Sequence, residues 1–300
     1  MIKTEGLTKR YGALTAVDHV SFTVQSGEVL GFLGPNGAGK TTTMRMIAGF
    51  IEPTSGTASI CGHDVLKQPL AAKAALGYLP EGAPGYGEMT VDGFLRFAAD
   101  LRGLQRAQRA VRLRYVIERL ELGSVLTQTL DTLSKGFRRR VGLAQALVHD
   151  PPVLILDEPT DGLDPNQKHE VRSLISEMAR SKLIVISTHI LEEVEAVCTR
   201  AIIIARGRIV ADDTPQGLAA QSRYHGAVSV RLRDAADHER ARAALAALPA
   251  VAELEYSANE ARLTAIPRNG GGAPLGAAVG DALDRSGIPL RSLAIEAGRL

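Results

Sequence analysis

The chain has 300 residues, of which 45% are hydrophobic, and its formal net charge at pH 7 is +2. This length predicts about two domains with a sizeable core, and so small a charge gives no case for nucleic acid as the main partner. Two cysteines exclude a disulfide framework, so we expect Cys61 and Cys198 to be small buried residues in a reducing compartment. The N-terminus lacks the apolar core of a signal peptide and no apolar run approaches about 18 residues, so we expect no membrane crossing by this chain.

The first 30 residues alternate between apolar and polar side chains, most clearly over 16–24, which predicts strands. A further strand is predicted at 28–33, and a helix starts near Thr41. The segment between them fits the pattern G-x-x-x-x-G-K-[ST], with Gly34, Pro35, Asn36, Gly37, Ala38, Gly39, Lys40 and Thr41. Chance gives this pattern in roughly one chain in a hundred of this length. The strand–loop–helix context therefore predicts a phosphate-binding loop.

The chemistry of this loop predicts nucleotide binding. Its glycines let backbone N–H groups turn towards a polyphosphate, and the helix N-terminus adds the positive end of its dipole. We expect Lys40 to reach the β- and γ-phosphates of ATP and the Thr41 hydroxyl to bind Mg²⁺, with Thr42 also at the nucleotide.

The middle of the chain alternates between predicted helices and predicted strands. A hairpin is expected around Pro53–Gly56, and residues 88–147 are expected to be mostly helical. Continuous apolar runs at 153–156, 183–187 and 201–205 predict buried parallel strands. This alternation favours an α/β fold with a parallel sheet.

Two acids, Asp157 and Glu158, follow the apolar run at 153–156. At the end of a buried strand, Asp157 can hold Mg²⁺ directly or through water, and Glu158 can orient and deprotonate an attacking water. The alternative is an exposed acidic turn. The phosphate loop upstream favours the functional interpretation.

The segment Leu133-Ser134-Lys135-Gly136-Phe137 lies between the phosphate loop and the two acids and resembles the signature motif of a known family. It resembles the signature L-S-G-G-Q of the nucleotide-binding subunit of ABC transporters, which stands ahead of a helix. Lys135 replaces the first central glycine and Phe137 replaces the glutamine, whereas Ser134 and Gly136 remain. The resemblance covers about residues 2–220 and is greatest to the exporter-associated subfamily, which includes gliding-motility and drug-resistance ATPases.

The resemblance implies roles for four further residues. Tyr11 matches the aromatic residue that stacks on adenine, although alone it is an ordinary surface tyrosine. Glu81 stands where the family has a glutamine that touches Mg²⁺ and the membrane partner, so its metal role is a departure. Asp164 matches the acid of the loop that crosses the dimer interface. His189 matches the histidine that contacts the γ-phosphate, and a structural histidine is the alternative.

The resemblance also implies the fold: a P-loop NTPase with a parallel sheet core, a β-rich N-terminal subdomain and a helical subdomain. Family members bind two ATP molecules between two subunits. Ser134 and Gly136 would then cap the γ-phosphate held by Lys40 of the partner subunit. The ammonium of Lys135 either lies near that phosphate or points to solvent. One phosphate loop per chain implies pairing with a second copy or with a similar ATPase subunit.

The expected function is ATP binding and hydrolysis that energises a membrane transporter, with export as the expected direction. The partner would be an integral membrane permease, and the chain a peripheral protein on the cytoplasmic face of the cell membrane. One alternative is a soluble ABC-type ATPase outside transport. Another is a non-catalytic nucleotide-binding regulator, which the intact set of Lys40, Asp157, Glu158 and His189 disfavours.

Arginines mark two other stretches. The region 101–120 carries Arg102, Arg106, Arg109, Arg112, Arg114 and Arg119, which form either a solvated face or a docking surface near anionic lipid headgroups. The glycine- and proline-rich segment 81–89 is a second candidate for contact with the permease. Residues 138–140 are three arginines on the expected signature helix, and we expect them to be partly solvated and partly facing nucleotide or interface.

The tail predicts a separate small domain. Residues 215–226 have the composition of a linker, and the domains are expected at 1–220 and 221–300. The tail then predicts a strand, a helix, two strands, a helix and a strand, at 227–233, 237–247, 251–256, 261–266, 274–285 and 290–295. That order is the ferredoxin-like βαββαβ arrangement, with 269–272 as the loop before its second helix. Its expected role is regulatory or in dimerisation, and the alternative is a passive cap.

Overall fold

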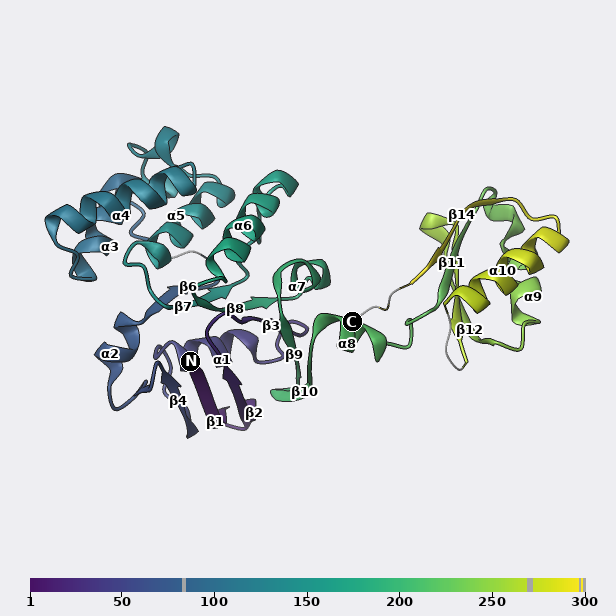
Figure 1. Ribbon diagram of the computed structural model, residues 1–300, viewed down its shortest axis with the longest axis horizontal. Coiled ribbons are helices and arrows are strands. Elements are labelled where there is room, and N and C mark those ends of the chain that lie inside the picture. Colours follow the sequence, from purple (N-terminus) through teal and green to yellow (C-terminus); the bar gives the residue numbers. More distant parts are fainter. Residues whose placement is uncertain (83–84, 269–271, 297, 299–300) are drawn as a thin grey trace. The chain divides into compact units, whose positions relative to one another are not determined.

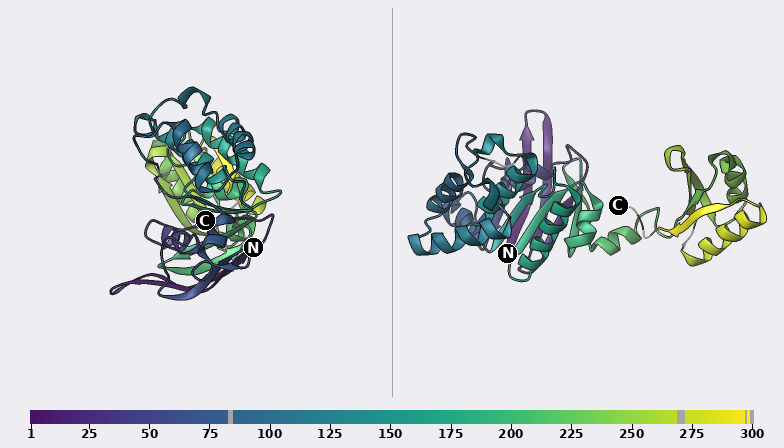
Figure 2. Two further views of the ribbon diagram at one scale, coloured as in Figure 1. Left: turned by 90° about the vertical axis from the view of Figure 1, so that its left-hand side faces the viewer. Right: turned by 90° about the horizontal axis from the view of Figure 1, so that it is seen from above.

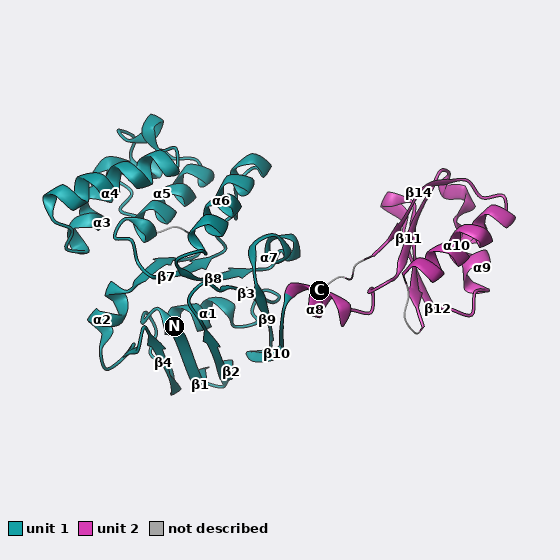
Figure 3. Ribbon diagram, in the orientation of Figure 1, with its two compact units in different colours: residues 1–214 teal, residues 215–300 magenta. Residues whose placement is uncertain are grey.

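The computed structural model describes residues 1–82, 85–268, 272–296 and 298. It divides into two compact units, residues 1–214 and 215–300 (Figure 3). We expected the second domain to begin at 221. The boundary lies earlier because Pro215 and Gly217 belong to helix α8 (Pro215–Ala220), whose Leu218 is buried. Proline is well tolerated in the first turn of a helix, so the segment that resembles a linker is helical.

The first unit is built around a six-stranded sheet in the order β10-β9-β3-β8-β7-β6. Its strands are β3 (Val29–Leu33), β6 (Leu76–Leu79), β7 (Val153–Asp157), β8 (Leu183–Thr188), β9 (Arg200–Ala205) and β10 (Arg208–Asp213). All neighbouring pairs are parallel except β10 with β9. The buried parallel strands predicted at 153–156, 183–187 and 201–205 are therefore confirmed.

A second, antiparallel sheet has the order β2-β1-β4-β5, from β1 (Ile2–Tyr11), β2 (Leu14–Val24), β4 (Ser55–Ile60) and β5 (His63–Asp64). The hairpin expected around Pro53–Gly56 is wrong. Gly56 lies in β4, where a Cβ would come within 2.3 Å of the Gly6 carbonyl oxygen, so glycine permits close strand approach there. The turn lies instead at Cys61 and Gly62, which both have positive φ, and Cys61 is exposed rather than buried.

Helices cover both faces of the parallel sheet. They are α1 (Lys40–Ile47), α2 (Pro69–Ala74), α3 (Val91–Leu101), α4 (Arg106–Arg119), α5 (Lys135–Leu147), α6 (Pro165–Met178) and α7 (Leu191–Val197), with single turns at Gly123–Val125 and Leu130–Thr132. The helical stretch expected over 88–147 is confirmed as α3, α4 and α5. Figures 1 and 2 show these three helices grouped together, apart from the antiparallel strands.

The parallel sheet separates two hydrophobic cores. Along β7, Leu154 and Leu156 join the core under α3–α6, whereas Val153 and Ile155 join the core shared with α1 and the antiparallel sheet. Successive side chains of a strand point to opposite faces, so a continuous apolar run fills both cores. This burial fixes the ends of β3, β6, β7 and β8, where the polar residues of the site begin.

The second unit has the order β11 (Val228–Leu232), α9 (His238–Ala246), β12 (Val251–Ser257), β13 (Arg262–Pro267), α10 (Ala273–Arg285) and β14 (Leu290–Ile295), with single turns at Ala235–Asp237 and Ala258–Glu260. Its antiparallel sheet has the order β12-β13-β11-β14. This is the predicted ferredoxin-like topology. It has its own core, which includes Val228, Leu263 and Val279. Of the predicted loop 269–272, residues 269–271 lie outside the described residues.

Candidate active site

The phosphate loop joins β3 to α1. Gly39 precedes α1 with φ 106°, a conformation that other residues rarely adopt, and a Cβ there would lie 2.5 Å from the Ala16 carbonyl oxygen. At Gly34 a Cβ would lie 2.3 Å from the Ile204 carbonyl oxygen. The loop is thus pressed against neighbouring backbone at both positions. This packing holds the start of α1 at the end of the parallel sheet.

Lys40 folds back over this loop. Its Nζ donates to the carbonyl oxygens of Gly34 at 2.6 Å and Pro35 at 3.1 Å, and the residue is 6% exposed. An ammonium has three donors, so these two bonds hold the charge at the loop and leave a donor for a phosphate oxygen.

A cavity of about 410 Å³ opens above the loop. Its lining includes Asn36, Gly37, Ala38, Gly39, Lys40, Thr41, Thr42, Tyr11, Leu14, Ala16, Glu81 and Glu158. Of the residues predicted to form the loop, Gly34 and Pro35 are absent from this lining and serve Lys40 instead. Tyr11 is 48% exposed, with Lys9 Nζ 5.2 Å from its ring centroid. A lining that combines an aromatic ring with the ammonium of Lys40 suits a nucleotide.

Asp157 and Glu158 end β7 in different environments. Asp157 is fully buried, and its Oδ1 accepts a hydrogen bond from the Ser187 hydroxyl. Its Oδ2 is buried and has no partner among the described residues. A buried carboxylate oxygen without a partner is costly unless a ligand satisfies it. With the hydroxyl of Thr41, Asp157 offers the oxygen donors that Mg²⁺ prefers, so these residues fit the metal.

Glu158 adopts the left-handed conformation, with φ 53°. Its amide donates to the Ser187 carbonyl oxygen at 3.0 Å, and its Oε1 lies 2.9 Å from Nδ1 of His189. His189 follows β8 and its side chain is 49% exposed, whereas that of Glu158 is 16% exposed. The two predicted catalytic residues are therefore brought together, and Glu158 faces the same cavity as Lys40.

Comparison with known proteins agrees with this geometry. Residues 17–161 match the family model described as ABC transporter. The Nod factor export ATP-binding protein I of Paraburkholderia xenovorans is 40% identical over 220 residues, which cover 73% of this chain and 72% of that protein. The chain belongs to the ABC transporter ATP-binding family. It is accordingly an ATPase subunit of that family.

Two further similarities show how much of this chain and of each relative is matched. The probable multidrug ABC transporter ATP-binding protein YbhF of Escherichia coli is 39% identical over 223 residues, which cover 74% of this chain but only 38% of that protein. A solved structure of an ATP-binding subunit of an ABC transporter is 33% identical with a TM-score of 0.69, covering 74% of this chain and 92% of that one.

The ABC signature lies at the start of α5, outside the cavity of its own chain. Ser134 caps α5 by accepting a hydrogen bond from the amide of Phe137 at 3.3 Å. Gly136 is buried, and a Cβ there would lie 2.9 Å from Gln167 Oε1. The predicted residues Ser134, Lys135 and Gly136 are therefore not brought to the loop that carries Lys40 within this subunit.

Lys135 is largely exposed and forms an ion pair within its own chain, so both interpretations offered by the sequence stay open. Its Nζ lies 2.8 Å from Asp161 Oδ2 of the same chain. This hydrogen bond holds the pKa of the Asp161 carboxyl below its ordinary value, and burial opposes the shift. Both side chains are largely exposed, so the ion pair is weak. It nevertheless ties the signature of an ABC subunit to the loop that contains Asp164, which caps α6 through the amide of Gln167.

Sequence reasoning missed two buried groups in this ABC subunit. Glu193 in α7 is 3% exposed and accepts hydrogen bonds from the hydroxyls of Thr160 and Thr188, which adjoin the segments of Glu158 and His189. Arg139 in α5 is 5% exposed and donates to carbonyl groups near Asp157. The three consecutive arginines were the only signal for the second group. Thr160 is 33 residues from Glu193 and Thr188 five, and neither spacing marks the glutamate as buried.

The arginines of 101–120 mostly pair within the chain. Arg102 donates to the Lys73 carbonyl oxygen, and Arg109, Arg112 and Arg119 pair with Asp100, Asp150 and Glu177. The region is also interrupted, since α3 ends at Leu101 and α4 begins at Arg106. These contacts favour the solvated, structural interpretation over a lipid-docking surface.

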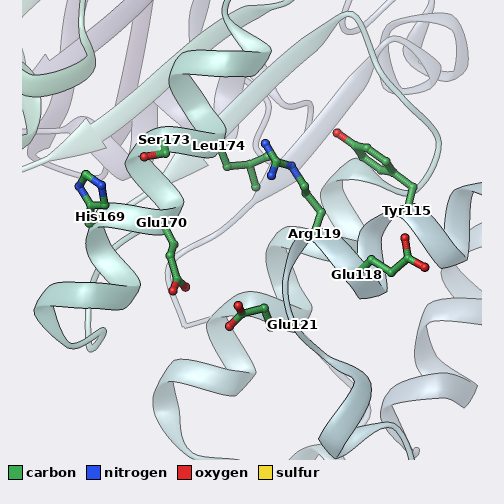
Figure 4. Close-up of a pocket in the computed structure, with 8 residues that line it drawn as sticks. All are labelled: Tyr115, Glu118, Arg119, Glu121, His169, Glu170, Ser173 and Leu174. Atoms are coloured by element: carbon green, nitrogen blue, oxygen red, sulfur yellow. The ribbon is translucent and has the colours of Figure 1, made fainter.

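A second hollow of about 400 Å³ lies between α4 and α6 (Figure 4). Its lining includes Glu121 and Glu170, whose carboxylates accept hydrogen bonds from Arg140 at 2.9 and 2.8 Å. Both acids are therefore engaged in holding α5 against its neighbours. The hollow carries no residue of the ABC nucleotide site.

Proposed function

We propose that this chain hydrolyses ATP in an ATP-driven dimer and so energises a membrane exporter. The observation that carries the proposal is the pairing of Glu158 with His189 beside the cavity that contains Lys40, while the signature lies outside that cavity. A site with a base and a phosphate loop but without its signature is half complete. A second subunit, supplying Ser134 and Gly136 at the N-terminus of its α5, completes it.

Within one site, Lys40 and the loop amides bind the β- and γ-phosphates, and Tyr11 stacks on the adenine. Glu158 accepts the proton of the attacking water, and His189 orients Glu158 and contacts the γ-phosphate. Mg²⁺, held by Thr41 and Asp157 with Glu81 nearby, would neutralise phosphate charge. Closing two subunits around ATP excludes water, so hydrolysis depends on dimerisation.

An apolar cleft supports the permease as partner. It has a volume of about 300 Å³, and its lining includes Phe50, Tyr78, Leu101 and Pro80. Pro80 directly precedes Glu81 in the sequence. Phe50 is 66% exposed and Leu101 71% exposed, although both are large apolar residues. Such a cleft suits an apolar segment of a cytoplasmic permease loop. Among the described residues no helix is long and apolar enough to span a bilayer, so membrane attachment would come through this partner.

The relatives named as Nod factor export ATP-binding proteins favour export over import. The competing function is an ABC-type ATPase outside transport. It needs no permease, so the exposed apolar cleft favours the transporter.

The test is co-expression with the integral membrane permease that we propose as the partner. We expect the chain to co-purify with it in detergent and Phe50→Asp to abolish co-purification without changing ATP affinity. Val210→Asp is the matched control, since Val210 is 61% exposed but lies on β10. Failure of the chain to co-purify with any integral membrane protein, although it turns over ATP, would favour the alternative outside transport.

A further inference from the structure

Two of the three arginines at the start of α5 are buried, whereas the sequence led us to expect a group that is partly solvated and partly facing nucleotide or interface. Arg139 is 5% exposed and Arg140 6% exposed. Neighbouring residues on a helix point in different directions, so the two guanidinium groups reach different partners. Arg140 binds Glu121 and Glu170 together with the Leu120 carbonyl oxygen, all away from the nucleotide cavity.

Arg139 instead binds backbone carbonyl groups at the ends of two strands. Its Nη1 donates to the carbonyl oxygen of Pro80 at 2.9 Å, just after β6. Its Nη2 donates to the carbonyl oxygens of both Asp157 and Glu158, at the end of β7. One side chain thus joins the signature helix, the segment that leads to Glu81, and the strand end that carries the catalytic acids.

The surroundings of this guanidinium are unusual for a structural arginine. Burial lowers the pKa of Arg139, and the nearby carboxylates of Asp157, Asp161, Glu158 and Glu81 oppose that shift. Among the described residues, no hydrogen bond joins Arg139 to a carboxylate. Its charge is thus offset by carboxylates at a distance, while its own donors bind the backbone carbonyl groups at the two strand ends.

The carbonyl groups of Asp157 and Glu158 flank the Cα atom of Glu158. The peptide planes on either side of a residue determine the direction of its Cα–Cβ bond. Glu158 has φ 53°, which a non-glycine residue keeps only when its surroundings enforce it. The amide of Glu158 is already fixed by the Ser187 carbonyl oxygen, and Arg139 fixes the carbonyl groups before and after it.

We propose that Arg139 is a positioning residue for Glu158, and that it links the direction of this carboxylate to the signature helix and to the Glu81 segment. The inference rests on the proposed function, in which Glu158 is the base. Arg139 is not among the residues that line the nucleotide cavity. Through it, movement of α5 on dimer closure, or of residues 80–81 on permease docking, reaches the catalytic acid.

The first test separates catalysis from binding in the full-length protein. Arg139→Gln should lower kcat about 100-fold, the cost of misplacing a catalytic group by roughly 1 Å, and leave the affinity for a fluorescent ATP analogue unchanged. Arg139→Lys keeps the charge, but its single nitrogen cannot reach both strand ends. Its kcat should therefore lie between that of the parent and that of Arg139→Gln. If Arg139→Gln does not fold, Arg139→Lys alone decides: kcat equal to the parent's overturns the proposal.

Arg140→Gln is the matched control, since it removes an equally buried arginine one position along the same helix. It should lower thermal stability while kcat per folded molecule stays close to that of the parent. Equal losses of kcat in Arg139→Gln and Arg140→Gln would overturn the proposal, because a general weakening of α5 would explain both.

A double-mutant cycle provides the second test. In a Glu158→Gln background the base is absent, so adding Arg139→Gln should change the single-turnover rate little. A further loss of about 100-fold in that background would show that Arg139 acts by another route and would refute the inference. A parent protein that does not turn over ATP at all would instead refute the proposed function, so the two failures are distinguishable.

Discussion

Replacing Glu158 with glutamine isolates the proposed chemical step. Glutamine has the same shape, so its amide oxygen can keep the 2.9 Å contact with Nδ1 of His189, and the backbone contacts of residue 158 are unchanged. What is lost is the ability to accept a proton from water. Removing a general base costs about 10²- to 10⁴-fold in rate, which is roughly 2.7–5.4 kcal/mol of transition-state stabilisation.

The assay is single-turnover hydrolysis of radiolabelled ATP, paired with size-exclusion chromatography in ATP. Nucleotide affinity should match that of the parent, and the stalled variant should accumulate as an ATP-bound dimer. Glu177→Gln is the control, since Glu177 forms a largely exposed ion pair with Arg119 away from the nucleotide cavity. Turnover of Glu158→Gln at the parent rate would show that Glu158 is not the base.

Four further predictions follow from named contacts. Lys40→Ala should lose most affinity for ATP, because its ammonium supplies charge to the phosphates, and fluorescence titration that finds unchanged affinity would contradict the phosphate-loop assignment. Lys135→Gly removes the pair with Asp161. If the ammonium also acts on the partner subunit's γ-phosphate, the ATP-driven dimer should weaken and its dissociation constant should depend less on salt. An unaltered salt dependence would show that Lys135 contributes only to the pair with Asp161. Ending the chain at Thr214 should preserve ATP binding and change the dimerisation constant, and loss of ATP binding would make the second unit integral to the site. Burial lowers the pKa of His149 from 6.5 to about 4, so the folded state resists its protonation. Stability is therefore fully present above pH 6.5 and falls as pH drops towards 4, by about 2 kcal/mol at pH 5, and chemical denaturation of His149→Gln should lack that component.

Local patterns predicted several residues that the fold brings to one cavity. The phosphate loop, Asp157 with Glu158, and His189 each follow a strand recognisable as an apolar run, and parallel strands bring their ends to one edge of the sheet. The tail was predicted because its strands and helices differ clearly in periodicity.

Contacts between distant segments could not be predicted. Gly56 resembles a turn residue, yet it is needed because the Gly6 backbone lies against it. Arg139 resembles a surface residue, yet its partners lie at the ends of two strands, one before it and one after it in sequence. The pair of Lys135 with Asp161 joins two loops whose spacing depends on how α5 and α6 pack. In each case the tertiary fold supplies the partner, and the residue type alone does not identify it.

The left-handed backbone of Glu158 has an evolutionary consequence. A non-glycine residue in this conformation costs about 1–2 kcal/mol, so Glu158→Gly should raise the melting temperature while removing the carboxylate. Selection for heat resistance alone would therefore favour a subunit that is more thermostable but does not hydrolyse ATP. Because two subunits complete each site in the proposed dimer, such a subunit would still pair with normal copies and occupy their permeases. A mutation that improves the isolated protein would thus act dominantly against transport in the cell.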